Sequence, residues 1–309
     1  MAIFNTTLGQ MAFLFSLILI GYGLAKGKVL PQNTAVVLSK LENTLFIPCL
    51  VAGTFISNFT VERISGVKSL MLVSIVLCVI MIPVGSLIAK LFDKDKYARN
   101  IYTYGLVFSN FGFMGNAVVN AVFPDVFFEY ILFTLPFWVA IYIWGVPVLL
   151  IADTENKQTF LQRAKAFVNP MFVGMVIGMI IGLTGLQLPE WTNSLVKTLG
   201  DCMSPVAMLL TGVTVSFIDI RKTFTNFKIY LVSLVRLVAL PMVFVLLMPY
   251  IPMTETAKIC SLCFLSMPLG LNTIVVPGAY GRDTSLAAGM AIISHLLSCA
   301  TIPLMFMFL

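Results

Sequence analysis

Two stretches of this sequence decide the fold: Ser109–Val119 reads SNFGFMGNAVV, and Ser266–Val276 reads SMPLGLNTIVV. Each lies near the middle of a long apolar run and contains residues that interrupt helices. Proline lacks an amide hydrogen and clashes with the preceding turn, and glycine lowers helix propensity by about 1 kcal/mol. In hydrocarbon, a broken helix persists only against protein or a water-filled cavity, because unsatisfied backbone groups are costly there. The two stretches therefore predict two broken membrane helices beside a binding site.

The rest of the chain has the composition of an integral membrane protein. Its 309 residues are 59% hydrophobic and 10% charged, with a mean hydropathy of +1.00, whereas soluble domains carry roughly 25% charged residues. Long apolar runs recur, each sufficient for a hydrocarbon core of about 30 Å. They predict ten transmembrane helices, at residues 8–26, 36–57, 69–91, 99–123, 127–151, 169–187, 195–217, 229–250, 256–280 and 285–308.

Several function classes find no support in the sequence. The net charge of +6 does not indicate nucleic-acid binding, because the Lys and Arg residues lie in short loops between apolar runs. Cys260 and Cys263 form a CxxC pair, but with no second pair and no His cluster we interpret them as packing residues. No nucleotide-binding or hydrolase motif is found. We expect no enzyme activity, no metal and no cofactor. The first apolar run lacks a preceding cationic segment and is interpreted as a membrane helix.

The two halves of the chain resemble each other at a constant spacing. The stretch at Ser109 matches the stretch at Ser266 with residue numbers that differ by 157. Further matches at differences between 156 and 158 are Pro48 with Pro205, Pro83 with Pro241, Pro147 with Pro303, and Gly21 with Gly178. We therefore predict two five-helix repeats, residues 1–152 and 169–309, joined by a cytoplasmic loop at 153–168.

An odd number of helices in each repeat predicts that the second repeat is inverted. With the amino terminus outside, the inner loops collect fourteen Lys and Arg residues and the outer loops four. This distribution agrees with the positive-inside rule. It predicts a multi-pass protein of the cell membrane with both termini extracytoplasmic. Inverted repeats with paired broken helices are typical of secondary transporters.

The two stretches also resemble the auxin efflux carrier family, which includes plant auxin exporters and bacterial dicarboxylate carriers. The resemblance rests on Asn110-Phe-Gly-Phe-Met-Gly115 and on Met267-Pro-Leu-Gly-Leu-Asn-Thr273 in the penultimate predicted helix. It implies crossed, discontinuous fourth and ninth helices, a transport domain of helices 3–5 and 8–10, and a scaffold of helices 1, 2, 6 and 7. Asn110 matches the family's substrate-contacting Asn, and Pro268 matches its second crossover Pro. The sequence departs from the plant pattern at Ser109 and at Asn116-Ala117.

The candidate substrate-binding residues follow from the two breaks. They are Ser109, Asn110, Gly112, Gly115, Asn116, Pro268, Gly270 and Asn272. The amino-terminal ends of half-helices there offer backbone amides and positive dipoles to an anion. The asparagines can instead serve as hydrogen-bonding links between helices, and the serines can bond back to their own helices. These alternatives stay open.

Four ionisable residues lie within apolar runs, where charge is costly and often functional. Arg236 can hold a substrate carboxylate or pair with an acid, and its position before Pro241 predicts a place away from the breaks. His295 can relay a proton or be a hydrogen-bonded structural residue. Asp201 can carry protons, gate a vestibule, or pair with Lys197 at the interface. Glu42 is expected to extend to the inner interface.

These observations favour a secondary transporter of a small organic anion, a mono- or dicarboxylate, that works by elevator-type displacement of the transport domain. The alternative is a sensor or receptor that keeps a transporter fold and binds a solute without turnover. H⁺ and Na⁺ are both open as coupling ions. The expected partners are the organic anion and the lipid bilayer, with no nucleic acid, and a homodimer is left open.

Overall fold

The computed structural model describes residues 2–151, 170–217, 226–279 and 282–309, and the regular elements in these ranges are all helices. Seven of the described helical stretches are long and apolar enough to cross a membrane: Phe4–Lys26, Thr34–Asn58, Val67–Phe92, Pro124–Leu150, Glu190–Ser216, Phe227–Tyr250 and Ser285–Phe308. Each coincides with a predicted span. The chain is therefore a polytopic helical membrane protein.

The elements of the first half are α1 (Ala2–Lys26), α2 (Thr34–Leu41), η1 (Glu42–Phe46), α3 (Ile47–Asn58), α4 (Val61–Phe92), α5 (Lys96–Val107), η2 (Phe111–Gly115), α6 (Asn116–Val122), η3 (Pro124–Val126), α7 (Phe127–Ala140) and η4 (Ile141–Leu150), where η marks a π- or 3₁₀-helical segment. Those of the second half are α9 (Pro170–Thr184), α10 (Glu190–Asp201), α11 (Met203–Ser216), α13 (Phe227–Leu234), η5 (Val235–Ala239), α14 (Leu240–Leu247), η6 (Met248–Tyr250), α15 (Glu255–Ser266), α16 (Asn272–Ala279), α17 (Ser285–Met305) and η7 (Phe306–Phe308). The predicted connecting loop at 153–168 lies outside the described residues.

Three of the predicted spans do not form a single long helix. The span at 99–123 is divided between α5 and η2–α6, and the span at 256–280 is divided between α15 and α16. The span at 169–187 contains α9, which has 15 residues. All ten predicted spans thus contain helix, while their arrangement as an inverted repeat stays a prediction.

The first half and the second half are interlocked through glycine contacts. Helix α1 packs on α11, and α3 packs on α9. A methyl group at Gly21 would collide with the Leu209 carbonyl oxygen, and one at Gly212 would collide with that of Ile18. Backbones approach this closely in membranes where small residues line the interface, because hydrocarbon provides no hydrophobic force between helices.

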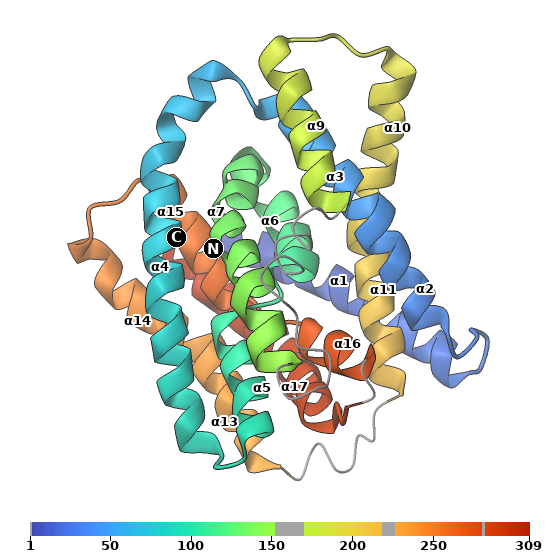
Figure 1. Cartoon of the computed structure of the whole chain (residues 1–309), viewed down its shortest axis with the longest axis vertical. Coiled ribbons are helices and arrows are strands. Elements are labelled where there is room, and N and C mark those ends of the chain that lie inside the picture. The colour runs from blue at the N-terminus through green and yellow to red at the C-terminus, as the bar shows by residue number, and fades with distance from the viewer. Residues whose placement is uncertain (1, 152–169, 218–225, 280–281) are drawn as a thin grey trace.

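The α3–α9 pair repeats this design. Gly174, Gly178 and Gly182 follow one another at intervals of four residues and therefore lie along one face of α9. A methyl group at Gly174 would lie 2.7 Å from the Pro48 carbonyl oxygen, and one at Gly178 would lie 2.7 Å from that of Ala52. In Figure 1, α3, α9 and α10 stand together at the upper right.

The remaining helices form a second packed group, in which α4 contacts α5, α7 and α15, and α17 contacts α13, α15 and α16. In Figure 1, α4 and α14 lie on the left, apart from α9 and α10. Leu72, Val79 and Leu87 on α4 are 63%, 62% and 61% exposed. Their spacing places them on one face of the helix, and such an apolar stripe is stable against lipid.

Two glycines on α1 give a matched test of this packing. Gly21→Ala should lower thermal stability, since overpacking a tight contact costs about 1–3 kcal/mol. Gly23→Ala should leave stability unchanged or raise it, because nothing lies within 4 Å of the new methyl group and alanine favours helix. Thermal unfolding of both variants in detergent checks this. Equal stability of the two variants would contradict the described α1–α11 contact.

Candidate functional site: the helix crossover

The first helix break lies where the sequence predicts it. Helix α5 ends at Val107, and helical structure resumes at Phe111. Phe108 has an extended backbone, with φ of −109° and ψ of 110°. Gly112 and Gly115 were expected to open this break, but both lie in the helical segment η2 that follows it, and the interruption itself spans Phe108 to Asn110.

The second break is centred on Pro268. Helix α15 ends at Ser266, and α16 begins at Asn272. The two interrupted segments cross as an antiparallel pair, in which Ser109 opposes Leu269. The amide of Asn110 donates to the carbonyl oxygen of Pro268 at 2.7 Å. A Cβ atom on Gly270 would lie 3.2 Å from the Phe108 carbonyl oxygen, so glycine permits the close crossing.

A single buried arginine satisfies carbonyls from both breaks. The Arg236 guanidinium donates through Nη1 to Leu106 at 3.0 Å, through Nη2 to Phe264 at 2.9 Å, and through Nε to Met267 at 3.3 Å. Its side chain is 0% exposed, and the guanidinium also lies 5.5 Å from the centre of the Phe264 ring. Five N–H donors in a rigid planar fork suit this task.

These carbonyls are free because of the breaks. In a continuous helix, Leu106 would accept from the Asn110 amide, and Phe264 would accept from residue 268. The Asn110 amide instead donates across the crossover, and Pro268 has no amide hydrogen. The prediction that Arg236 lies away from the breaks was wrong. Sequence distance from Pro241 did not reveal that η5 packs against α5 and α15.

Five of the eight predicted binding residues line one small cavity at the crossover. The cavity has a volume of about 20 Å³, and its lining includes Ser109, Asn110, Gly112, Gly270 and Asn272. A space of this size holds about one water molecule. The crossover therefore leaves a space that is too small for an organic solute.

The other three predicted residues do not line this cavity. Pro268 contributes its carbonyl to the crossing, as described. Gly115 faces Tyr130, whose ring carbon Cζ would lie 3.3 Å from an added Cβ. Asn116 is buried as the first residue of α6. Their assignment as binding residues stays a prediction.

Polar side chains around the crossover differ in how they are satisfied. The Asn110 side-chain nitrogen lies 3.0 Å from His295 Nε2, and His295 Nδ1 lies 2.7 Å from the Ala291 carbonyl oxygen. Asn272 donates to the Tyr104 hydroxyl at 3.0 Å. The hydroxyls of Ser109 and Ser266 are buried without a hydrogen-bond partner among the described residues. A buried hydroxyl left unpaired costs free energy unless a ligand or water meets it.

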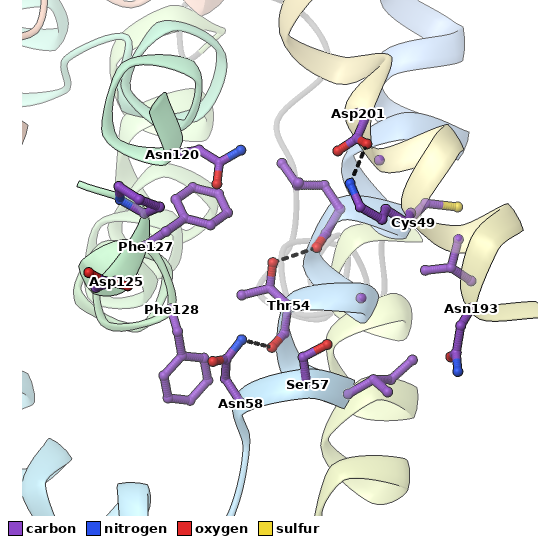
Figure 2. A pocket seen from close by; sticks show the side chains of 17 residues that line it. Cys49, Thr54, Ser57, Asn58, Asn120, Asp125, Phe127, Phe128, Asn193 and Asp201 are labelled. Atoms are coloured by element: carbon purple, nitrogen blue, oxygen red, sulfur yellow. Dashed lines mark hydrogen bonds and ion pairs between the residues drawn. The ribbon is translucent and has the colours of Figure 1, made fainter. Parts of the chain in front are cut away.

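A larger cavity of about 610 Å³ lies between the two packed groups of helices. Figure 2 shows Asn120, Asp125, Phe127 and Phe128 on one side, and Cys49, Thr54, Ser57, Asn58, Asn193 and Asp201 on the other. Asp201 is an exposed residue whose carboxylate accepts from Lys197 at 2.7 Å. Asp201 thus lines this cavity and pairs with Lys197, and its predicted role in proton transfer or gating stays a prediction.

Sequence reasoning misplaced or missed several residues. Glu42 does not extend to the interface: it is 0% exposed, and both carboxylate oxygens lack a partner among the described residues. It lies in the π-helical segment η1, which packs against α9, α10 and α11. Tyr104 and Trp138, which line the crossover cavity, were not predicted, because an aromatic residue in an apolar helix carries no distinguishing signal.

The sequence profile of the membrane transport protein family matches residues 6–306. The chain belongs to this family. The match covers both crossover segments and agrees with the resemblance to auxin efflux carriers. A comparison with curated proteins finds no match. Several apolar helices and the family together identify a membrane transport protein.

Arg236 should be essential to the stability of the crossover. Arg236→Met leaves three buried carbonyls without this donor, at about 1–3 kcal/mol each, and should lower the melting temperature by roughly 6 °C or more. The melting temperature of Arg236→Lys should lie between those of the wild type and Arg236→Met, since a compact ammonium cannot span three acceptors. Thermal unfolding checks this, with Lys197→Met in the exposed pair as the control. A wild-type melting temperature for Arg236→Met would refute the assigned role.

Proposed function

We propose that this membrane transport protein is a secondary transporter of a small organic anion and that the crossover is its binding site. The observation that carries this proposal is the distribution of charge at the crossing helix ends. Arg236 covers carbonyls at the ends of α5 and α15, while the segments that begin at Phe111 and Asn272 present their amino-terminal ends. Guanidinium and amino-terminal dipoles are both positive. Together, these positive charges favour the binding of a carboxylate at the crossover.

The buried Ser109 hydroxyl supports the same site. It lines the crossover cavity and has no hydrogen-bond partner among the described residues. A carboxylate at this place would accept from the hydroxyl and from nearby backbone amides, as anions do at helix amino termini. The small volume of the cavity fits a closed state that enlarges when the solute enters.

The inverted five-helix repeat is part of the proposal. Leu106 and Phe264, which share Arg236, differ by 158 in residue number, as do Asn110 and Pro268. Gly21 of α1 and Gly178 of α9 make corresponding contacts: Gly21 packs against the backbone of α11, and Gly178 packs against the backbone of α3. A two-fold relation between the halves explains both correspondences, because it maps the α1–α11 contact onto the α9–α3 contact.

The proposed movement is a displacement of one helix group past the other. The scaffold would comprise α1, α2–α3, α9 and α10–α11, which the glycine contacts hold together. The transport domain would comprise α4 to α7 and α13 to α17, which carry the crossover. The 610 Å³ cavity lies between these groups. With both termini outside, it faces the extracytoplasmic side and forms the vestibule through which the anion reaches the crossover.

Transport and the role of Asn110 have a direct test. Purified protein in liposomes should move malate, malonate or indole-3-acetate under an imposed pH, Na⁺ or voltage gradient. Asn110→Ala should weaken binding of the transported anion about ten- to hundredfold, since a hydrogen bond to a charged group contributes about 1.5–3 kcal/mol. Ligand-induced thermal stabilisation measures this.

The matched control is Asn43→Ala, because Asn43 is exposed and bonds to Ser39 of its own turn. It should bind and transport as the wild type does. Flux of none of these carboxylates under any gradient would count against the transporter proposal, and saturable binding without flux would favour a receptor. Wild-type affinity in Asn110→Ala would remove this residue from the site.

The proposed orientation has its own test. Cys49 lines the vestibule and is partly exposed, so a variant that retains only this cysteine should react with an impermeant maleimide added outside whole cells. A variant that retains only Cys260, which is 0% exposed, should stay unlabelled. Labelling of Cys49 only in inside-out vesicles would reverse the proposed topology.

A further inference from the structure

His295 occupies a position between the crossover and a second cavity. It is the one histidine of the chain and lies on α17 with its side chain buried. The imidazole contacts Asn110 at the crossover. It also lines a cavity of about 220 Å³ that is bounded by residues of α1 and α11, including Tyr22 and Thr211. The ring therefore forms part of the wall between this cavity and the crossover.

The hydrogen bonds of His295 determine its tautomer. The Ala291 carbonyl oxygen only accepts, so His295 Nδ1, 2.7 Å away, carries a hydrogen. In the neutral imidazole, Nε2 then has a lone pair and accepts. Asn110 must present its NH₂ group to Nε2, which agrees with the 3.0 Å contact of Nδ2. The carbonyl oxygen of the Asn110 amide is thereby turned away from His295.

A proton on Nε2 reverses this pairing. The imidazolium donates from both nitrogens, so an NH₂ group can no longer face Nε2. Rotation of the Asn110 amide by half a turn brings its oxygen to the new N–H and turns its NH₂ group away from His295. Asn110 also lines the crossover cavity together with the unpaired hydroxyl of Ser109. Protonation thus replaces an acceptor by a donor on the side of the Asn110 amide that points away from His295.

We propose that His295 is a proton-binding site coupled to anion binding at the crossover through the side-chain amide of Asn110. This inference rests on the proposed function and adds its coupling ion. The neutral imidazole leaves an amide oxygen that repels a carboxylate. The imidazolium provides an NH₂ donor and a positive charge, both of which attract it. A proton and an anion therefore bind cooperatively, and each raises the affinity of the other by the same factor.

The titratable residues on the neighbouring helices do not replace His295 as the proton-binding group. The elements packed against α17 include α1, α5, α13, α15, α16 and η5, and α11 joins them at the cavity. Their titratable or charged residues are Tyr22, Lys26, Lys96, Tyr97, Arg99, Tyr102, Tyr104, Lys228, Tyr230, Arg236, Glu255, Lys258, Cys260 and Cys263. Among the described residues, Tyr22 shares the cavity, and Arg236 donates to the crossover carbonyls. No charged side chain in the described part of the chain forms an ion pair or hydrogen bond with the imidazole. On α17 itself, Cys299 contacts the His295 carbonyl.

The tautomer can be observed directly, since one histidine gives one pair of ring signals. Protein labelled with ¹⁵N-histidine and studied by NMR at pH 8 should show protonated Nδ1 and unprotonated Nε2. Addition of the carboxylate that stabilises the protein best should convert Nε2 to the protonated form at a higher pH than in the free protein. Protonated Nε2 with unprotonated Nδ1 at pH 8, or an identical titration with and without carboxylate, would overturn the proposal.

Calorimetry tests the coupling. Titration of the same carboxylate in buffers of different ionisation enthalpy should show uptake of about one proton per bound anion, and affinity that rises by up to about tenfold for each unit of lower pH. His295→Gln keeps a donor and an acceptor near Nε2 without titrating, so proton uptake and this pH dependence should disappear. Tyr22→Phe, in the same cavity, should retain both.

The outcomes separate this inference from the proposed function. If no carboxylate binds at any pH, the proposed site itself fails. If carboxylates bind with pH-independent affinity and no proton uptake, the site stands and the coupling through His295 fails. Persistence of proton uptake in His295→Gln would place the proton elsewhere and would also overturn the inference. Should His295→Gln fold poorly, the NMR titration of the wild-type chain decides.

Discussion

The crossover depends on one buried guanidinium. Two broken helices in the middle of a membrane protein expose carbonyls that neither water nor lipid can satisfy, and this cost would favour closing each break into a continuous helix. Arg236 removes the conflict by donating to Leu106, Phe264 and Met267. Because one rigid group bonds to both breaks, it also fixes their relative position. The charge of the site and the geometry of the crossing therefore have a common origin.

The second break was predictable because its cause is local. Pro268 disfavours helix where it stands, so the sequence revealed where α15 ends, whereas α5 ends at Val107, ahead of Gly112 and Gly115, which lie in helix. The partners of the freed groups were not predictable. Arg236 and His295 reach the crossover across 130 and 185 residues of sequence, from Leu106 and Asn110, and only the packing of η5 and α17 brings them there. Glu42 shows the same limit, because helices α9, α10 and α11 of the second half pack against its segment and only the fold places them there.

The candidate site was predicted in part for the same reason. Ser109, Asn110, Gly112, Gly270 and Asn272 line one cavity, as expected for polar and small residues at two matched interruptions. Gly115 and Asn116 follow the first break by several residues. They lie in the helix that resumes at Phe111, and its geometry directs them toward other contacts. Polarity near a break is thus a good guide over about one helical turn and a poor guide beyond it.

The interlocked glycine contacts have a consequence for synthesis of the chain. Helix α1 packs on α11, and α3 packs on α9, so these close contacts of the first half are with helices that the ribosome makes later. Until these helices enter the bilayer, the glycine faces of α1 and the backbone of α3 must remain against lipid. Multi-element proteins are prone to misassembly at such stages. A truncated first half would therefore keep the packing of α4 on α5 and α7 but would lack the partners of α1 and α3.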